Sequence, residues 1–206
     1  MSNHKINEII PLFSSPVGFF PLKLKPNELK LARDMLEKEE LKDANLQGTF
    51  ISVNKQLVEQ EDYYFIKRAI NKSIKEFLNK SLLYSPVFKI TSSWLARLEP
   101  GYESLMHQHS NCAFSAACYI TIPENSGNIT FATQRPVTIT IPTYEYNVFN
   151  SLEYSIKPIE NSIVIFPSHL FHKVEKNMSN LPRLSIACNF MPMGEVGIGD
   201  SKYRYE

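Results

Sequence analysis

The sequence predicts a mainly β fold with helices at its N-terminal end, and three observations support this fold class. Two segments with helical spacing of apolar residues occur within residues 1–85. From residue 86 onward, short runs rich in β-branched and aromatic residues follow one another between turn residues. The chain contains no internal repeat and no low-complexity tract. Helices first and strands afterwards predict helices packed on one face of an antiparallel sandwich or barrel.

The N-terminal part is expected to pack on this β core. Residues 1–25 are apolar and punctuated by prolines, so Val17–Leu24 is expected to form an edge strand. A first helix is expected from Pro26 to about Lys42, where apolar residues recur at helical spacing. Residues 43–58 show no clear pattern and predict a loop. The apolar stripe along Gln60–Lys80 predicts a second helix packed against the sheet.

Eight strands are expected in the second part of the chain. Their ranges are Val87–Leu98, Leu105–Gln108, Ala113–Thr121, Asn128–Phe131, Leu152–Ile156, Ile163–Phe166, Phe171–Glu175 and Arg183–Phe190. The stretch Thr133–Ser151 lacks a strand pattern and is rich in aromatic residues, so we expect a long loop that covers one end of the barrel near a site. We expect one domain over residues 1–206, with residues 1–85 packed on a core formed by 86–192 and with 193–206 as a tail.

Composition and charge exclude several classes of protein. Twenty-two basic residues balance 21 acidic ones, with no basic run, so a nucleic-acid partner is not expected. No stretch of 18 apolar residues and no secretory signal is apparent, so no membrane span is expected. Three cysteines without C-x-x-C spacing argue against a disulfide scaffold and against a cysteine zinc site. These features favour a cytoplasmic protein.

Three histidines carry the first candidate site. His107 and His109 stand two residues apart, so in a strand they would point to the same face. His172 follows a buried-looking strand that ends at Pro167. Imidazole is a good ligand for iron, copper, nickel or zinc, and a ligand from a neighbouring strand would complete a three-residue metal site. An H-x-H pair alone is a weak signal, because two histidines on the solvent face of a strand have the same spacing.

Arg183 and Ser185 carry the second candidate site. Ten residues separate His172 from Arg183, and Ser185 is two residues further along, on the same face of an expected strand. Arginine offers a planar fork for a carboxylate, and the serine hydroxyl is a second donor. A co-substrate with two carboxylates and a keto group requires both a chelating metal and such an anion site.

This arrangement, H-x-H followed by a distant histidine and, ten residues later, by R-x-S, resembles the iron(II)- and 2-oxoglutarate-dependent dioxygenase superfamily. More narrowly, the chain is similar to short 2OG-Fe(II) oxygenases of marine bacteria and their phages. The resemblance covers about residues 90–190. It rests on Trp94, His107–His109, Phe114–Tyr119, Ile165–Ser168, His172 and Arg183–Asn189. The fold that it implies is a double-stranded β-helix, the jelly-roll core also found in cupins.

The resemblance implies that His107 and His172 bind iron(II). His109 stands where the superfamily commonly has a carboxylate, so the resemblance implies either a three-histidine site or a third ligand from water or an unplaced acidic residue. It further implies that Arg183 pairs with the distal carboxylate of 2-oxoglutarate and that Ser185 supports it. Tyr119 matches a tyrosine that donates its hydroxyl to the same carboxylate, although a packed barrel aromatic is an equally good interpretation.

The function implied by the resemblance is hydroxylation of a small-molecule or peptide substrate, coupled to oxidative decarboxylation of 2-oxoglutarate, with iron(II) as the metal. Two alternatives remain open on the sequence. One is a cupin-type three-histidine dioxygenase that does not use 2-oxoglutarate, because Gly101 precedes His107 at the cupin spacing. The expected cupin glutamate is missing, however, and cupins do not require the R-x-S pair. The other alternative is a non-catalytic jelly-roll binding or structural protein.

Overall fold

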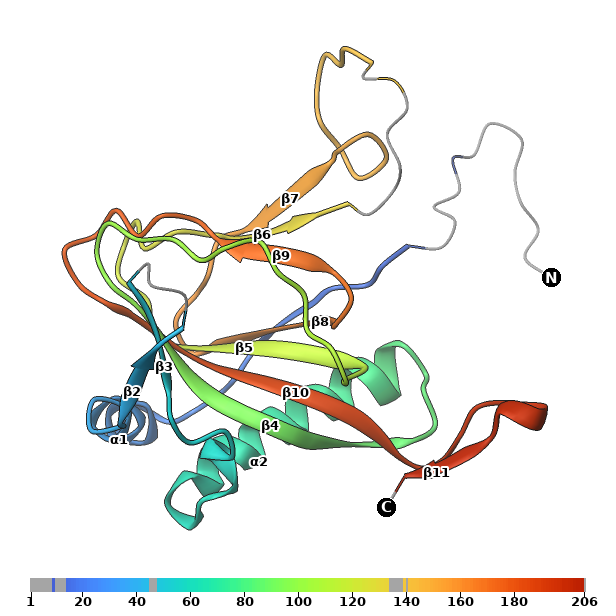
Figure 1. Cartoon of the computed structure of the whole chain (residues 1–206), viewed down its shortest axis with the longest axis horizontal. Helices are drawn as coiled ribbons and strands as arrows, with labels where there is room; N and C mark the ends of the chain where they lie inside the picture. The colour runs from blue at the N-terminus through green and yellow to red at the C-terminus, as the bar shows by residue number, and fades with distance from the viewer. Residues whose placement is uncertain (1–8, 10–13, 45–47, 134–138, 140, 206) are drawn as a thin grey trace.

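The computed structural model describes residues 9, 14–44, 48–133, 139 and 141–205, which form two antiparallel sheets that face each other (Figure 1). The major sheet has the order β1 (Gly18–Pro21), β8 (Ser162–Pro167), β5 (Phe114–Thr121), β10 (Arg183–Val196), β4 (Val87–Leu98), β3 (Thr49–Ser52), β2 (Leu41–Asp43), and β11 (Tyr203–Tyr205) pairs with β10. The minor sheet has the order β7 (Glu153–Ile156), β6 (Ile129–Ala132), β9 (Phe171–Val174). This architecture confirms the expected double-stranded β-helix.

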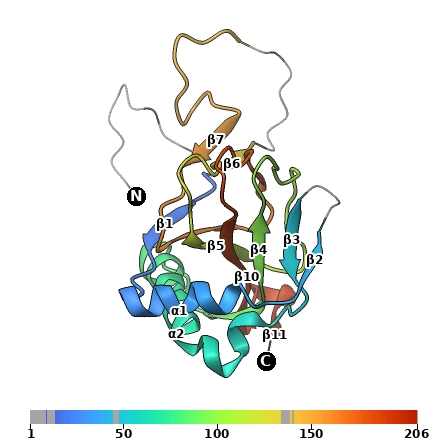
Figure 2. The same ribbon diagram turned by 90° about the vertical axis from the view of Figure 1, so that its left-hand side faces the viewer.

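The helices cover the face of the major sheet that points away from the minor sheet (Figures 1 and 2). They are α1 (Pro26–Leu36), α2 (Tyr64–Ile74) and the π-helical turn η3 (Lys75–Ser81) that continues α2, with short 3-10 turns at η1 (Leu57–Glu59), η2 (Glu61–Tyr63) and η4 (Gly199–Ser201). Pro26 begins α1, and the Glu28 carboxylate accepts a hydrogen bond from the Lys25 backbone N–H at 2.8 Å. Among the described residues, no helix is both long and apolar enough to cross a membrane.

The strand period of two separates a helix-covered face from a cavity face. On β10, Leu184, Ile186 and Cys188 are buried in the larger hydrophobic cluster, together with residues of the helices. Arg183 and Ser185 alternate with them and line a cavity between the two sheets. Apolar burial against the helices therefore determines the strand register, and the register points the polar residues of β10 toward the cavity.

The structure corrects three expectations. Residues 43–58 are not a loop, because β3 lies within them and pairs with β4. The first helix ends at Leu36 rather than near Lys42, and β2 begins at Leu41. Leu105–Gln108 does not form a strand; within it, only His107 makes a bridge, to His172. Short strands and isolated bridges contain too few residues to show a clear alternation of apolar and polar side chains, so the sequence pattern does not reveal them.

Segments near both ends of the chain belong to strands, and the C-terminal one extends further than the sequence suggested. The expected edge strand is present as β1, which pairs with β8. β10 continues to Val196, into the segment expected as a tail, and β11 pairs back on it with Gly194 opposite Tyr205. This hairpin projects from the lower right of the molecule in Figure 1.

Candidate functional site

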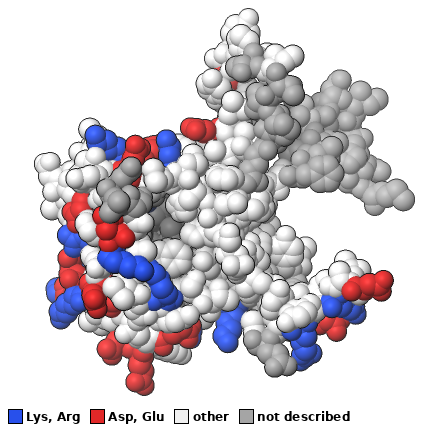
Figure 3. Space-filling model, in the orientation of Figure 1, with Lys and Arg blue, Asp and Glu red and all other residues white. Residues whose placement is uncertain are grey.

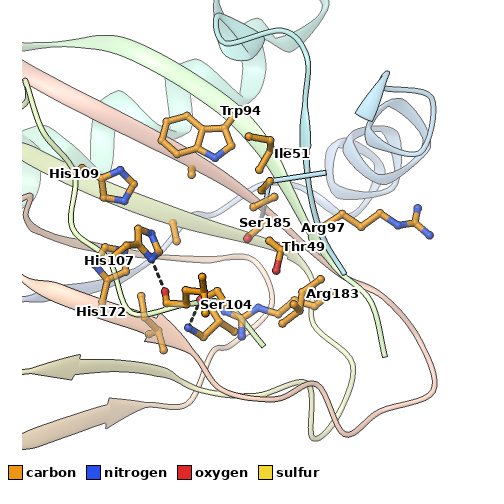
Figure 4. Close-up of a pocket in the computed structure, with 18 of the residues that line it drawn as sticks. Thr49, Ile51, Trp94, Arg97, Ser104, His107, His109, His172, Arg183 and Ser185 are labelled. Atoms are coloured by element: carbon orange, nitrogen blue, oxygen red, sulfur yellow. Dashed lines mark hydrogen bonds between the residues drawn. The ribbon is translucent and has the colours of Figure 1, made fainter. Parts of the chain in front are cut away.

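A cavity of about 350 Å³ lies between the major and minor sheets (Figure 4). Its walls are mostly apolar, and two groups of polar side chains on them are candidates for binding a ligand. One group consists of three histidines, and the other contains Arg183 and Ser185. The lining residues are Ala44, Thr49, Ile51, Trp94, Ala96, Arg97, Leu98, Ser104, Leu105, His107, His109, Ala116, Ala117, Ile129, Phe166, His172, Val174, Arg183, Ser185 and Ala187.

The three histidines expected from the sequence converge on one point. One ring nitrogen from each of His107, His109 and His172 lies within 4.8 Å of the others, a group that can hold a metal ion. Their ring centroids are 4.4–5.2 Å apart. His172 belongs to β9, whereas His107 and His109 belong to the segment between β4 and β5. The convergence is as predicted, but a β-bridge from His107 to His172 and a hydrogen bond from the His109 N–H to the Ser168 carbonyl (3.0 Å) produce it, rather than a continuous strand.

Backbone carbonyls orient two of the three imidazoles. The Nδ1 atom of His107 is 2.8 Å from the Leu105 carbonyl oxygen, and Nδ1 of His172 is 2.9 Å from the Leu170 carbonyl oxygen. Because a carbonyl oxygen only accepts, each Nδ1 must carry the proton, and each Nε2 keeps its lone pair for another partner. Metal-binding histidines are usually oriented in this way by a hydrogen bond from the second ring nitrogen.

Burial keeps two of these imidazoles neutral. Desolvation, followed by the nearby His107, lowers the pKa of His172 to about 3. The same two causes lower the pKa of His109 to about 4. Phe166 and Phe131 pack against the His172 ring, with centroids 4.7 and 5.9 Å away. The neutral ring is the form that binds a metal, so the site is ready to coordinate one at neutral pH.

Arg183 is buried at the other end of the cavity (Figure 4). Only 3% of the residue is exposed, and desolvation lowers the pKa of its guanidinium. Nη1 donates a hydrogen bond to the Gly127 carbonyl oxygen at 2.6 Å, and the guanidinium carbon lies 5.2 Å from the centre of the Tyr119 ring. Among the described residues, no carboxylate forms an ion pair with Arg183. A buried cation without a counter-ion is costly, so a carboxylate ligand in the cavity would stabilise it.

Ser185 and Tyr119 add hydroxyl groups beside Arg183. Ser185 lines the cavity and stands opposite Tyr119 in the pairing of β10 with β5. The Tyr119 side chain is fully buried, and its hydroxyl has no hydrogen-bond partner among the described residues. Burial raises the pKa of Tyr119 to about 12, although the Arg183 charge acts in the opposite direction. A hydroxyl that remains protonated and unpartnered is available to donate to a ligand held by Arg183.

Ser115 and His169 lie near these groups but do not line the cavity, whereas Trp94 does. The Ser115 hydroxyl donates to Asn189 Oδ1 at 2.9 Å and lies 2.8 Å from the Ser168 hydroxyl, so it belongs to a buried polar network rather than to the cavity wall. His169 is exposed and does not line the cavity. Trp94 does line it, 5.7 Å from His109 between ring centroids.

The sequence reasoning missed the wall formed by β3, by Ala44 just after β2 and by the segment after β4. Thr49, Ile51 and Ser104 line the cavity there. The Ser104 hydroxyl accepts a hydrogen bond from the Val174 N–H at 2.6 Å, which ties this segment to β9. The run Thr49-Phe50-Ile51 is rich in β-forming residues and was a signal for a strand, but its short length concealed it.

The expected lid does not line this cavity in the part that the structure describes. Of the stretch Thr133–Ser151, residues 134–138 and 140 lie outside the described residues. The others lie between β6 and β7, and Figure 1 shows this segment extending away from the two sheets. None of them contributes to the cavity wall.

Residues 92–189 match the family described as "Putative 2OG-Fe(II) oxygenase". The matched region runs from β4 to β10 and contains the three histidines, Tyr119, Arg183 and Ser185. Over this region, just under half of its length, the chain matches the 2OG-Fe(II) oxygenases. Among curated proteins, no sequence matches it.

Solved structures of 2OG-Fe(II) oxygenases share the fold of this chain at low sequence identity. An oxidoreductase of the 2OG-Fe(II) oxygenase family from Burkholderia pseudomallei has 12% identity and a TM-score of 0.63, over 84% of this chain and 83% of that one. HygX from Streptomyces hygroscopicus, crystallised with nickel and 2-oxoglutarate, has 11% identity and a TM-score of 0.62, over 86% and 83%. A Pseudomonas putida prolyl-4-hydroxylase has 19% identity and a TM-score of 0.57, over 88% and 95%.

Proposed function

We propose that this protein is a 2OG-Fe(II) oxygenase that binds iron(II) through His107, His109 and His172 and uses 2-oxoglutarate to hydroxylate a C–H bond of a small-molecule or peptide substrate. One observation carries the proposal: a single cavity has three converging imidazoles at one end and a buried arginine without a counter-ion at the other. A chelating dicarboxylate requires these two features at the two ends of one cavity.

The residues present suit this metal and co-substrate. Imidazole is a common ligand of non-haem iron(II), and the neutral rings of His109 and His172 require no proton loss before binding. His109 takes the position at which the common triad has a carboxylate, so the three neutral ligands would leave the metal with more positive charge. When bound, iron(II) and 2-oxoglutarate supply the oxidising chemistry with dioxygen, releasing succinate and carbon dioxide.

In this proposal the protein positions the co-substrate, supplies a positive charge for its carboxylate and excludes water. Arg183 would bind the distal carboxylate of 2-oxoglutarate, with Ser185 beside it and the unpartnered hydroxyl of Tyr119 as a further donor. Trp94 and Phe166 line the cavity near the histidines and would exclude water from the reacting groups.

The type of oxidation is part of the proposal. Structures with this fold include a prolyl-4-hydroxylase, a carbocyclase and an epimerase by their descriptions, so the fold alone is compatible with several outcomes. Hydroxylation is the outcome that requires no further group on the protein. A cupin-type enzyme that does not use 2-oxoglutarate would have no use for Arg183 in its cavity.

The deciding experiment is 2-oxoglutarate turnover without a prime substrate. Protein reconstituted with iron(II) under anaerobic conditions is exposed to oxygen, and succinate is measured against 2-oxoglutarate concentration. We expect slow, saturable succinate formation that the Arg183→Met variant loses at low 2-oxoglutarate. If the iron-loaded protein neither binds 2-oxoglutarate nor releases succinate, the proposal is wrong.

A further inference from the structure

Two lysines stand beside the part of the cavity wall that Thr49 and Ile51 of β3 form. Lys42 on β2 lies opposite Ile51 on β3, and Ile51 lies opposite Ala96 on β4. Residues opposite each other in adjacent strands project to the same face of a sheet. Since Ile51 and Ala96 line the cavity, Lys42 projects on the cavity face at the end of this row. Its neighbour Leu41 packs against the core on the helix side, as the alternation of a strand requires.

Lys55 follows β3 and is held over the aromatic wall of the cavity. Its ammonium nitrogen lies 5.7 Å from the centre of the Trp94 ring and donates a hydrogen bond to the Ser52 carbonyl oxygen at 2.7 Å. Trp94 lines the cavity and is 5.7 Å from His109 between ring centroids. The charge of Lys55 is therefore separated from the three histidines by a single aromatic side chain.

These two ammonium groups lack carboxylate partners. Burial, and after it the nearby Lys42, lower the pKa of Lys55 to about 8. Within the described residues, neither lysine forms an ion pair, whereas Lys67 pairs with Glu59 at 2.6 Å. Exposed lysines often lack partners. Lys55, however, is half-buried and close to a second cation, and both conditions disfavour its charged form relative to a lysine in water.

Two of the acidic side chains near this wall are already paired with Arg97. Arg97, on the neighbouring strand, binds Glu37 at 3.0 Å and Glu99 at 2.6 Å. Figure 3 shows acidic and basic side chains mixed over α1, β2 and β3 on the left of the molecule, while the middle of this face carries almost no charge. Glu37 and Glu99 thus neutralise Arg97, and among the described residues no carboxylate forms an ion pair with Lys42 or Lys55.

We infer that Lys42 and Lys55 form a recognition site for an oxyanion group of the prime substrate, which would bind at the β2–β3 edge with its reactive part beside Trp94. This inference rests on the proposed function. The site is distinct from the co-substrate site, because Lys42 is three strands away from Ser185, about 14 Å at the usual strand spacing. A carboxylate and a sulfate or phosphate group share the chemistry required.

The experiment uses Trp94, which is the one tryptophan of the chain and therefore reports on this wall alone. Protein loaded with nickel(II) and saturating 2-oxoglutarate, so that the histidines and Arg183 are occupied, is titrated with sodium sulfate and with sodium acetate while tryptophan fluorescence is followed. Sodium chloride at equal ionic strength is the reference. We expect a saturable change with at least one oxyanion, and the tighter of the two assigns a tetrahedral group or a carboxylate.

The variants determine whether the lysines cause the response. Lys55→Met and Lys42→Met should each weaken oxyanion binding by about tenfold, as for the loss of one hydrogen bond to a charged group. Lys55→Arg should retain binding, and so should Lys89→Met, because Lys89 is exposed on the same strand as Trp94 but five residues away from it. A response no different from chloride, or equal binding by the two methionine variants and wild type, overturns the inference.

Calorimetry of 2-oxoglutarate on the same nickel-loaded samples separates this inference from the proposed function. Oxyanion binding that depends on Lys55, in a protein that does not bind 2-oxoglutarate, would contradict the proposed function and leave the anion site standing. Binding of 2-oxoglutarate without a lysine-dependent oxyanion response would contradict the anion site alone.

Discussion

The backbones of His107 and His172 are joined by two hydrogen bonds, from the His107 N–H to the His172 carbonyl at 2.9 Å and from the His172 N–H to the His107 carbonyl at 2.8 Å. The two residues are far apart in sequence, and the bridge joins β9 to the segment between β4 and β5, which forms no strand there. Because both backbones are held directly, the two imidazoles have little freedom to separate. The three-histidine site is thus largely pre-organised by backbone pairing, which is what a metal centre requires.

Replacement of His172 should abolish stoichiometric metal binding. His172→Ala removes a buried ring whose free Nε2 points toward the other two histidines, and two remaining imidazoles form a much weaker site. We expect iron(II) or nickel(II) affinity to fall by at least about 100-fold, by analogy with the 10–100-fold cost of losing only an outer partner of a ligand. Calorimetric titration of the anaerobic protein measures this. His169→Ala, an exposed histidine three residues away, is the matched control and should bind metal normally.

Replacement of Arg183 should separate co-substrate binding from metal binding. Arg183→Met keeps much of the side-chain volume but leaves the distal carboxylate of 2-oxoglutarate without a cation in a dry cavity. We expect 2-oxoglutarate binding to weaken by about 2–5 kcal/mol, the range for truncating one partner of a buried charge pair. Metal affinity should remain that of wild type.

Arg97→Met is the control for this change, because Arg97 also lines the cavity but is already paired with Glu37 and Glu99. It should leave 2-oxoglutarate binding within about 0.5 kcal/mol of wild type, as for substitutions away from a binding contact. Equal losses in the two arginine variants would mean that the cavity responds to any removed charge and that Arg183 has no special role.

Tyr119→Phe should have opposite effects on the free and the bound protein. The hydroxyl is buried without a hydrogen-bond partner, so its removal should leave the stability of the ligand-free protein unchanged or slightly higher. If the hydroxyl donates to the 2-oxoglutarate carboxylate, its loss should weaken that binding by about 1.5–3 kcal/mol. Thermal unfolding with and without 2-oxoglutarate measures both effects. Unchanged 2-oxoglutarate affinity would instead identify Tyr119 as a packed barrel aromatic, because phenylalanine keeps the packed ring.

The projecting segment before β7 should not contribute to metal or co-substrate binding. Tyr146 and Phe149 are 74% and 47% exposed, and neither lines the cavity. A Tyr146→Ser, Phe149→Ser double variant should therefore change metal affinity, 2-oxoglutarate affinity and stability by no more than about 0.5 kcal/mol each. Weaker 2-oxoglutarate binding in this variant would show that the segment reaches the cavity in solution, as a lid would.

Much of the fold could be predicted from the sequence where a strand is long or buried. The expected strand Val87–Leu98 coincides with β4, and Arg183 begins β10 as expected. Alternation along β10 also predicted that Arg183 and Ser185 share a face, and the cavity confirms it. The failures are short elements such as β2 and β3, in which three or four residues give too little periodicity and the tertiary pairing with β4 supplies the stability.

The candidate side chains could be read from the sequence alone: two histidines at H-x-H spacing, a third histidine, and an arginine after ten intervening residues. Which of these side chains meet in space depends on the tertiary structure. It brought His109 to the same point as His107 and His172 without a continuous strand to align them, and it left the buried Tyr119 hydroxyl beside Arg183 and the Lys55 ammonium over the Trp94 ring. The physical reason is that local patterning reports which face a residue prefers. Distances between segments remote in the sequence depend on how the two sheets close over their common core.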